Sequence, residues 1–247
     1  IVNDFNPSTI CHLAAQAGVR HSINNPQLYV DNNITSTLNV LEAARINNVK
    51  DVVFASTSSV YGLTKEVPFN EEMDTGTPIS AYSASKKSCE LLCHTYHHLF
   101  GIRFRILRFF TVYGPWGRPD MALTIFTKSI INKEPVKLYN EGEMSRDFTY
   151  IDDLISGILS SISNKFNFEI FNLGSGKPIP LKEYIFSIEK ALRRKSEKTL
   201  LPMQQGDVHR TWADISKAQN MLSYNPSMNL DEGVTKFVNW YKDYYKF

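Results

Sequence analysis

Two continuous apolar runs, each preceded by a segment with helical periodicity, limit the folds open to this chain. Residues 30–44 carry apolar side chains at intervals of three and four, and the run Val52-Val53-Phe54-Ala55 follows shortly afterwards. Residues 80–100 form a second such segment, and the run 104–110 follows it. Apolar runs of this kind are typical of strands buried on both faces, and their alternation with helices requires crossover connections. The sequence therefore predicts a parallel sheet flanked by helices.

The elements after Pro115 are shorter and more mixed. We expect helices at 121–132, 181–194 and 230–245, a helix opened by Asp152 and Asp153, and strands near 136–139, 147–150 and 169–173. The predicted fold class is α/β, with a doubly wound parallel sheet and a smaller α+β portion. We place the first domain at residues 1–115 and the second mainly at residues 116–247, with some elements of the second returning to the first.

Composition and charge exclude several classes of function. The 27 lysines and arginines against 25 acidic residues leave a formal net charge of +2, which predicts no broad basic surface for nucleic acid or an anionic membrane. The apolar stretches are far shorter than the ~20 residues of a membrane-spanning helix. Cys11, Cys89 and Cys93 are too few for a disulfide framework. We therefore expect a cytoplasmic protein without nucleic-acid or membrane partners.

Cys89, Cys93 and His97 share one stripe of the predicted helix 80–100, because they are spaced by four residues. Such a stripe could bind a metal. Zinc, however, takes four ligands in a tetrahedron, and one straight helix presents only two neighbouring ligands to a single ion. We predict no metal site and interpret the stripe as packing against the core or a second subunit. The apolar segment 89–100 could pair with its copy, so the expected assembly is a homodimer.

Tyr82 and Lys86 lie one helical turn apart on the same face of the predicted helix. A free phenol ionises near ~10, so a tyrosine needs a nearby positive charge to act as a base at neutral pH. Four hydroxyls, from Ser56 to Ser59, follow the preceding buried strand, and parallel sheets bind ligands beyond the carboxyl ends of their strands. These hydroxyls could hold a substrate against the phenol. A capped helix with a surface lysine and a serine-rich turn explains the same residues, and both interpretations stay open here.

Longer motifs resemble a known family. Ser56-Thr-Ser-Ser-Val-Tyr-Gly62, the pattern Tyr82-x-x-x-Lys86, the stretch Leu107 to Met121, and Arg146-Asp-Phe-Thr-Tyr-Ile-Asp-Asp153 are similar to motifs of the extended short-chain dehydrogenase/reductases that act on nucleotide sugars. Within that family the motifs most resemble those of UDP-glucuronate 4-epimerases. The resemblance covers nearly the whole chain. It implies a Rossmann-type sheet, an NAD cofactor and a UDP-sugar substrate that the smaller α+β portion binds.

The resemblance implies that Thr57, Tyr82 and Lys86 are the catalytic residues. Tyr82 would remove the proton of the sugar 4-hydroxyl, and Thr57 would hydrogen-bond that hydroxyl. Lys86 would lower the pKa of Tyr82 and bind the nicotinamide ribose. Hydride would pass from the sugar C4 to nicotinamide and return to the opposite face of the 4-keto sugar. The implied activity is epimerisation of UDP-glucuronate to UDP-galacturonate, with no net redox change.

The resemblance also implies a set of binding residues. The cofactor would contact Tyr82 and Lys86 and, in addition, Ala14, Ala15, Gln16 and Asn33. The residues implied to contact the substrate are Arg20, Ser58, Ser59, Thr111, Arg118, Arg146 and Asp207. Thr111 and Arg118 would face the sugar carboxylate, which suits a guanidinium fork, whereas Arg146 would meet the diphosphate. Asp207 would bind the uridine ribose. Surface charges or structural ion pairs are the alternative interpretation of the charged residues.

Two other functions are compatible with these motifs. Related sugar-nucleotide dehydratases carry an acidic residue just after the threonine, whereas this chain has Ser58 and Ser59 there. A serine hydroxyl has too high a pKa for the acid/base role in elimination of water, which disfavours dehydration. The second alternative is a sugar-nucleotide binding protein without redox activity. The presence of Thr57, Tyr82 and Lys86 favours the enzyme, because a binding protein does not need an ionisable phenol beside an ammonium.

The start of the chain departs from the family pattern. The first predicted strand, Ile10 to Leu13, matches the fourth strand of the family. This sequence has no counterpart of the glycine-rich turn that binds the cofactor pyrophosphate or of the acidic residue that binds the adenosine ribose. We therefore expect that about 80 residues of the family pattern are missing on the N-terminal side. On this basis we predict that the 247-residue chain alone binds NAD poorly.

Overall fold

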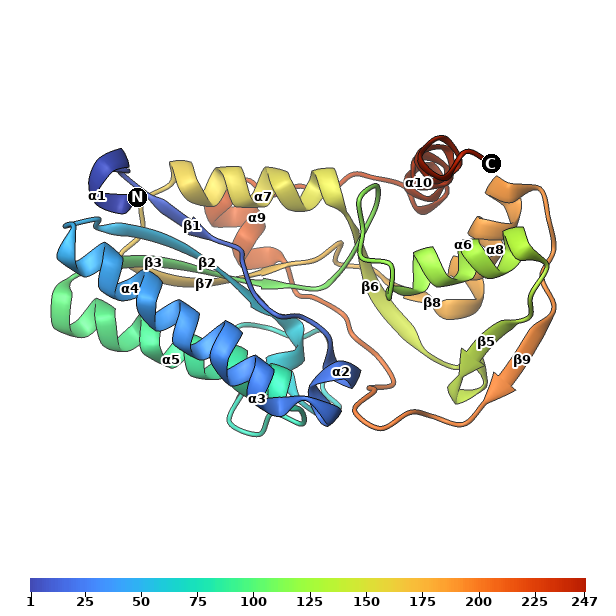
Figure 1. Ribbon diagram of the computed structural model, residues 1–247, viewed down its shortest axis with the longest axis horizontal. Coiled ribbons are helices and arrows are strands. Elements are labelled where there is room, and N and C mark those ends of the chain that lie inside the picture. The colour runs from blue at the N-terminus through green and yellow to red at the C-terminus, as the bar shows by residue number, and fades with distance from the viewer.

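The computed structural model describes residues 1–247 and has two lobes (Figure 1). The first lobe contains a four-stranded sheet in the order β1-β2-β3-β7, and every pair of neighbouring strands is parallel. Its strands are β1 (Ile10–His12), β2 (Asp51–Thr57), β3 (Arg103–Phe109) and β7 (Phe168–Leu173). The predicted parallel sheet is therefore confirmed, with β1 at one edge and β7 at the other.

Helices cover both faces of this sheet, as Figure 1 shows. On one face α4 (Ser36–Ile46) and α5 (Ala81–Phe100) pack through Leu41, Cys89 and Cys93 against Val52 and Phe54. On the other face α7 (Ile151–Ser163) and α9 (Ser216–Leu222) pack against the alternate strand residues, which include Val53, Leu107 and Phe171. Because both faces are buried, β2 needs apolar residues at consecutive positions. This accounts for the first apolar run.

The second lobe is built from shorter elements. It contains the three-stranded sheet β4-β6-β8 and the two-stranded sheet β5-β9, covered by α6 (Ala122–Asn132), α8 (Leu181–Leu192) and α10 (Leu230–Tyr245). The strands are β4 (Thr111–Tyr113), β5 (Val136–Tyr139), β6 (Ser145–Tyr150), β8 (Pro178–Pro180) and β9 (Lys198–Leu201). Eighteen buried apolar residues form its core, in which the Phe148 and Tyr184 rings stack at 3.8 Å. The chain crosses between the lobes several times, since β7, α7 and α9 belong to the first.

One predicted helix is interrupted in the structure. The helical segment expected from Pro26 to Asn48 consists of α3 (Pro26–Tyr29), a π-helical turn (Val30–Thr35) and α4. The π turn carries Asn33, whose side-chain oxygen accepts from the Gln16 backbone N–H at 2.7 Å. Such turns insert an extra residue and are frequent at functional sites. A regular helical period predicts neither the insertion nor the contact it serves.

Other boundaries follow the sequence prediction closely. Helix α5 begins after Ser80, which forms a capping box with Ser83, and ends at Gly101, whose φ is 64°. Helix α10 has the predicted bounds, whereas α8 ends two residues earlier than predicted, at Leu192. The prediction did not include β8, β9, α9 or the short helices α1 (Val2–Phe5) and α2 (Val19–Asn24). No helix in the structure has both the length and the apolar character needed to cross a bilayer.

Candidate active site

Two adjoining cavities open beyond the carboxyl ends of β2 and β3, between the lobes. The first has a volume of about 650 Å³, and its lining includes Thr57, Ser58, Ser59 and Tyr82. The second has a volume of about 600 Å³, and its lining includes Arg20, Arg146 and Asp207. Thr111 and Arg118 line both cavities. The structure thus gathers Thr57, Tyr82 and the residues predicted for substrate binding around one cleft, whereas Lys86 lines neither cavity.

Tyr82 lies in the first turn of α5 and is half-buried at the cleft. Its ring packs edge-on against Tyr29, with the ring centroids 6.0 Å apart. Burial raises the pKa of Tyr82 above its usual value, while the nearby Thr57 hydroxyl and the charge of Arg118 lower it. The sequence did not single out Tyr29, because no motif marks it. Its hydroxyl donates to the backbone oxygens of Ala17 and Gly18, which fixes the segment that leads into α2.

Lys86 lies one turn after Tyr82 and is only 3% exposed. Its Nζ lies 4.4 Å from the centroid of the Phe54 ring, and burial lowers its pKa to about 8. Thr57 and Arg118 are the groups that lower the pKa of Tyr82 in this structure. The ammonium of Lys86 packs on Phe54, and its effect on the pKa of the phenol stays a prediction.

The serine-rich segment divides between the two sides of β2. Ser56 was expected in a turn with the other hydroxyls, but it belongs to β2. It borders the first cavity, and its hydroxyl donates to Glu90 at a distance of 2.6 Å. Thr57 follows it on the cleft side. Its hydroxyl accepts from the Ser59 backbone N–H at 3.2 Å and caps the short 3-10 helix Ser58–Tyr61. Ser58 and Ser59 are half-buried and line the first cavity.

The charged side chains of the second cavity are interlinked. Arg20 donates to Asp207 at 2.9 Å across 187 positions of sequence, and its guanidinium lies 5.2 Å from the centroid of the Tyr139 ring. Arg146 donates to the backbone oxygens of Ser145 and His209, beside the segment that carries Asp207. Burial lowers the pKa of Arg146. Four cations (Arg20, Arg118, Lys137 and Arg146) and two carboxylates (Asp120 and Asp207) therefore line this cavity. Lys137 and Tyr139 are further lining residues that the sequence did not reveal.

Arg118 lies on the loop after β4 and is less constrained. Both ends of its guanidinium donate to Asp120, each at 3.0 Å, and its side chain is 41% exposed. Gly114 begins this loop with a φ of 143°, and a Cβ there would lie 2.6 Å from the Ile151 side chain. The loop conformation therefore requires glycine. An exposed ion pair of this kind contributes little to stability, so Arg118 can exchange Asp120 for another carboxylate.

Ala14 and Ala15 are exposed just beyond β1, and Gln16 is half-buried. Asn33 is only 1% exposed. Its amide nitrogen donates to the Gln16 oxygen at 3.0 Å and to the Ser85 hydroxyl at 2.8 Å, in addition to the bond its oxygen accepts. Asn33 thus ties the segment at Gln16 to α5. These contacts give Asn33 a positioning role, and the direct cofactor contact expected from the sequence stays a prediction.

The stripe of Cys89, Cys93 and His97 does not converge on one point. Both cysteines are fully buried in the core between α5 and the sheet, where the Cys89 thiol donates to the Asn33 backbone oxygen at 3.4 Å. The His97 ring nitrogen Nδ1 lies 2.8 Å from the Ile102 backbone oxygen. Nowhere in the structure do three or more histidine, cysteine or acidic side chains gather as a metal site would require.

Comparison with known proteins identifies the family. Residues 1–174 match the model of the NAD dependent epimerase/dehydratase family. The chain belongs to this family. A protein from Methanocaldococcus jannaschii is 50% identical over 240 residues, which are 97% of this chain and 74% of that protein. A UDP-glucuronate 4-epimerase from Thermodesulfobacterium geofontis is 46% identical over 244 residues, which are 98% of this chain and 75% of that enzyme.

A solved structure extends the likeness to three dimensions. The UDP-glucuronic acid 4-epimerase from Bacillus cereus, in complex with UDP-glucuronic acid and NAD, superposes with a TM-score of 0.92 at 38% identity. The match covers 98% of this chain and 77% of that one. The predicted Rossmann-type α/β fold and the predicted family are therefore confirmed. The protein is an NAD-dependent enzyme of the epimerase/dehydratase family.

The residues at the cleft fit the NAD that this family uses. Lys86 is a buried ammonium without a carboxylate within ion-pair distance, so its donors are free to bind the hydroxyls of a ribose. The small exposed side chains of Ala14 and Ala15 leave the backbone after β1 open to close approach. Tyr82 lines the cavity that Arg118 also lines. Lys86 and the segment at Ala14 stay the predicted cofactor contacts of this chain.

The burial of Lys86 predicts a pH-dependent cost to stability in this family member. In the unfolded chain its pKa returns to about 10.4, so the unfolded state binds more protons between about pH 8 and pH 10.4. Stability therefore rises with pH across this window, and the full penalty applies below it. We expect Lys86→Met to raise the free energy of unfolding at pH 7 by about 2 kcal/mol, since the contact with Phe54 offsets part of the penalty.

Urea unfolding at pH 7 and pH 10.5 measures this effect. The gain from Lys86→Met should largely vanish at the higher pH, where the wild-type lysine is neutral. Lys128→Met is the matched control, because Lys128 is exposed on α6, and its effect should stay within about 0.5 kcal/mol at both values. A wild-type protein more stable than Lys86→Met at pH 7 would show that the ammonium is not penalised by burial.

Proposed function

We propose that this protein converts UDP-glucuronate to UDP-galacturonate by epimerisation at C4 with NAD. The observation that carries the proposal is the single cleft in which Tyr82 and Thr57 adjoin the cations Arg20, Arg118 and Arg146. A UDP-sugar acid carries negative charge on its diphosphate and on its carboxylate, and this charge pattern matches the cations. The relatives include enzymes named UDP-glucuronate 4-epimerase, and the substrate in that name carries both of these negatively charged groups.

The chemistry assigned to the chain is proton transfer and positioning. NAD, when bound, would supply the acceptor and the donor for the hydride of the sugar C4. The phenolic oxygen of Tyr82, as phenolate, takes the proton of the 4-hydroxyl, and Thr57 hydrogen-bonds the same oxygen. Because burial raises the pKa of Tyr82, a positive charge must act on it in the working complex, and Arg118 already does so in this structure.

Inversion at C4 requires the 4-keto sugar to present its opposite face before the hydride returns. The cavity beside Tyr82 has a volume of about 650 Å³. This volume allows a hexose ring to turn while the nucleotide stays bound in the adjoining cavity. We assign the second cavity to the nucleotide, with Arg146 on the diphosphate and Asp207 on the uridine ribose. Arg20 would then hold Asp207 in place through its ion pair.

Dehydration is the second candidate within the same family. It needs an acidic group beside the sugar C5 and C6, where this chain carries Ser58 and Ser59 after Thr57. No carboxyl group lines the cavity that holds Tyr82. The residues present therefore favour epimerisation, in which no water is eliminated.

The proposal is tested with UDP-glucuronate labelled with deuterium at C4. In the presence of NAD, proton NMR should reveal UDP-galacturonate that keeps deuterium at C4, because the hydride that leaves is the one that returns. No net NADH should accumulate in the absorbance at 340 nm. A dehydrated or decarboxylated product, or no turnover by protein that calorimetry shows to bind both NAD and UDP, would overturn the proposal.

The position of Arg118 in the cleft predicts that the enzyme prefers a sugar that carries a carboxylate. We expect Arg118→Met to raise KM for UDP-glucuronate about 30-fold, because a charge-assisted bidentate pair contributes about 2 kcal/mol. KM for UDP-glucose, which has no carboxylate, should change less than about threefold. Initial rates with both sugars measure the difference. Arg210→Met is the control, because Arg210 is exposed and lines neither cavity. An equal change for both sugars would remove Arg118 from carboxylate recognition.

We also propose a homodimer in the cytoplasm. Leu91 and Leu99 on α5 have 57% and 61% of their surface exposed, and they lie on the helix segment expected to pair with its copy. Cysteines that are all free agree with a reducing compartment.

A further inference from the structure

A row of polar side chains crosses the sheet at the level of Ser56, which borders the first cavity. Ser56 on β2 pairs in register with Arg108 on β3, and Arg108 pairs with Asn172 on β7. Residues paired in this way point to the same face of a parallel sheet. All three are at most 3% exposed. The next position of β2 is Thr57, which lines the catalytic cavity, so the row lies directly beneath that cavity.

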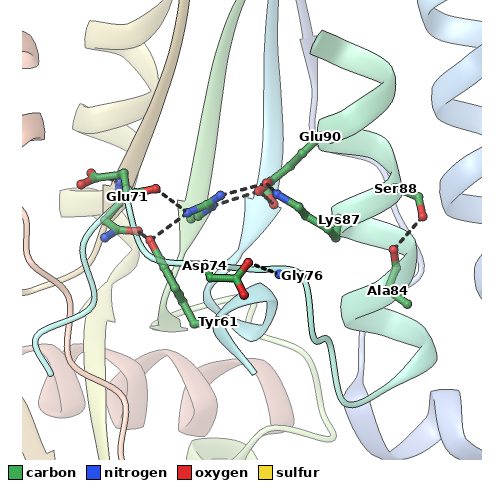
Figure 2. A network of polar contacts seen from close by, with 11 residues as sticks. Tyr61, Glu71, Asp74, Gly76, Ala84, Lys87, Ser88 and Glu90 are labelled. Atoms are coloured by element: carbon green, nitrogen blue, oxygen red, sulfur yellow. Dashed lines mark hydrogen bonds and ion pairs between the residues drawn. The ribbon is translucent and has the colours of Figure 1, made fainter. Parts of the chain in front are cut away.

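Glu90 on α5 connects the row to the helix that carries Tyr82 and Lys86. Its carboxylate accepts from the Ser56 hydroxyl at 2.6 Å and from two nitrogens of Arg108, at 3.0 Å and 2.9 Å. On its other side Arg108 donates to the Tyr61 hydroxyl at 3.1 Å and to the Glu71 backbone oxygen at 3.3 Å. Figure 2 shows Glu90 pointing from α5 toward Tyr61 and Glu71 across this network.

Stability alone does not explain this network. Glu90 and Arg108 are 3% and 2% exposed, and a pair buried so deeply loses about as much in desolvation as it gains by attraction. Apolar side chains of the same volume commonly stabilise a fold as well or better. What an ion pair with two parallel hydrogen bonds adds is a defined distance and orientation between the elements it joins. Here those elements are β2 and β3 on one side and α5 on the other.

The network lies where the orientation of α5 relative to β2 affects the position of the candidate catalytic residues. Glu90 follows Lys86 by four residues, so both lie on one face of α5, and Ser56 is the neighbour of Thr57. We propose that Glu90 is a positioning residue for the proposed epimerase reaction, which holds α5 against the Ser56 end of β2 and places a carboxylate one helical turn from the Lys86 ammonium. The inference rests on the proposed function for its kinetic part and on the fold alone for its electrostatic part.

The charges around Lys86 support the electrostatic part. Glu90, Cys89 and Cys93 on α5 raise the pKa of Lys86 against the effect of burial. Burial raises the pKa of both thiols, so they are neutral at working pH, and His12 on β1 is neutral as well, because its pKa is lowered to about 4. Glu90 is therefore the anion that counters the desolvation of Lys86. Arg108 and Lys87 in turn lower the pKa of Glu90 and keep it ionised.

The test replaces Glu90 with glutamine, which keeps the shape and one acceptor but removes the charge. The first readout needs no activity: NMR titration of lysine labelled at Cε, with the Lys86 signal assigned by its loss in Lys86→Met. We expect the pKa of Lys86 to fall below the value of about 8 in the wild type. The second readout is kinetic. In the enzyme supplied with NAD, kcat should fall about tenfold to a hundredfold, with the alkaline limb of its pH profile shifted to lower pH.

Two further variants separate charge from position. Ser56→Ala removes one contact of Glu90 and leaves its charge, so kcat should fall about threefold while the pKa of Lys86 stays at its wild-type value. Glu42→Gln is the matched control, because Glu42 also accepts from an arginine and a tyrosine, Arg45 and Tyr96, but on α4 away from the cleft. It should change neither readout.

The outcomes are decisive in each case. A folded Glu90→Gln with an unchanged Lys86 pKa and pH profile would overturn the inference. If Glu90→Gln does not fold, Ser56→Ala decides the positioning part, and an unchanged kcat there would count against it. A wild-type protein without turnover of UDP-glucuronate would instead refute the proposed function, while the Lys86 titration would still report on the electrostatic effect of Glu90.

Discussion

Tyr82→Phe is expected to lower kcat by about 10³-fold while UDP binding stays intact. The phenol is the group assigned to remove the proton from the 4-hydroxyl, and loss of a positioned general base costs about 10² to 10⁴ in rate. Its ring lines the cavity beside Thr57 and packs edge-on against Tyr29, and phenylalanine retains that ring. The substitution removes the proton acceptor and leaves the cleft in shape.

Two measurements separate this effect from damage to the fold. Conversion of UDP-glucuronate followed by NMR gives the rate, and titration calorimetry with UDP gives the affinity, which should change less than about twofold. Tyr96→Phe is a matched control on the same helix, because the Tyr96 hydroxyl donates to Glu42 on α4 and does not face the cleft. Its kcat should be that of the wild type. Retention of more than a few per cent of the rate in Tyr82→Phe would remove Tyr82 from its assigned role.

The sequence predicts the first lobe well because burial on two faces leaves a clear mark. Val52 and Phe54 pack toward α5 while Val53 packs toward α7, so consecutive positions must be apolar. The same reasoning places the hydroxyls after this strand at the site. It does not reveal toward which neighbour each hydroxyl points. The Ser56 hydroxyl contacts Glu90, and Ser56 pairs with Arg108 of β3 whereas Thr57 pairs with Phe109.

Contacts between distant segments lie beyond what local patterns reveal. Arg20 and Asp207 were each predicted to bind substrate, but only the folded chain brings them together at 2.9 Å. The position of the Lys86 ammonium over Phe54 depends on the packing of α5 against β2, which a spacing of four residues cannot describe. The family resemblance singles out Asn33, but the regular period of its predicted helix does not reveal the π turn or the bond of Asn33 to Gln16.

Asp147 carries the second large effect, on stability. It is fully buried in β6, and its carboxylate accepts hydrogen bonds from Ser175, Gly176, Ala213 and Thr149. Asp147→Ala would leave these donors without a partner in a site that water does not reach. Each bond to a charged group contributes about 1.5 to 3 kcal/mol, and the donors recover part of it by relaxation. We expect the free energy of unfolding to fall by about 4 kcal/mol.

Urea unfolding measures this loss, with Asp153→Ala as the control. Asp153 also accepts from two backbone N–H groups, those of Ser227 and Met228, but at an accessible helix start, so its loss should be about 1 kcal/mol. Asp147 holds Ala213, which ends the segment that carries Asp207 into the nucleotide cavity. UDP affinity in Asp147→Ala should therefore fall even under conditions where the variant is folded. Equal losses of stability in the two variants would mean that burial does not set the strength of the Asp147 contacts.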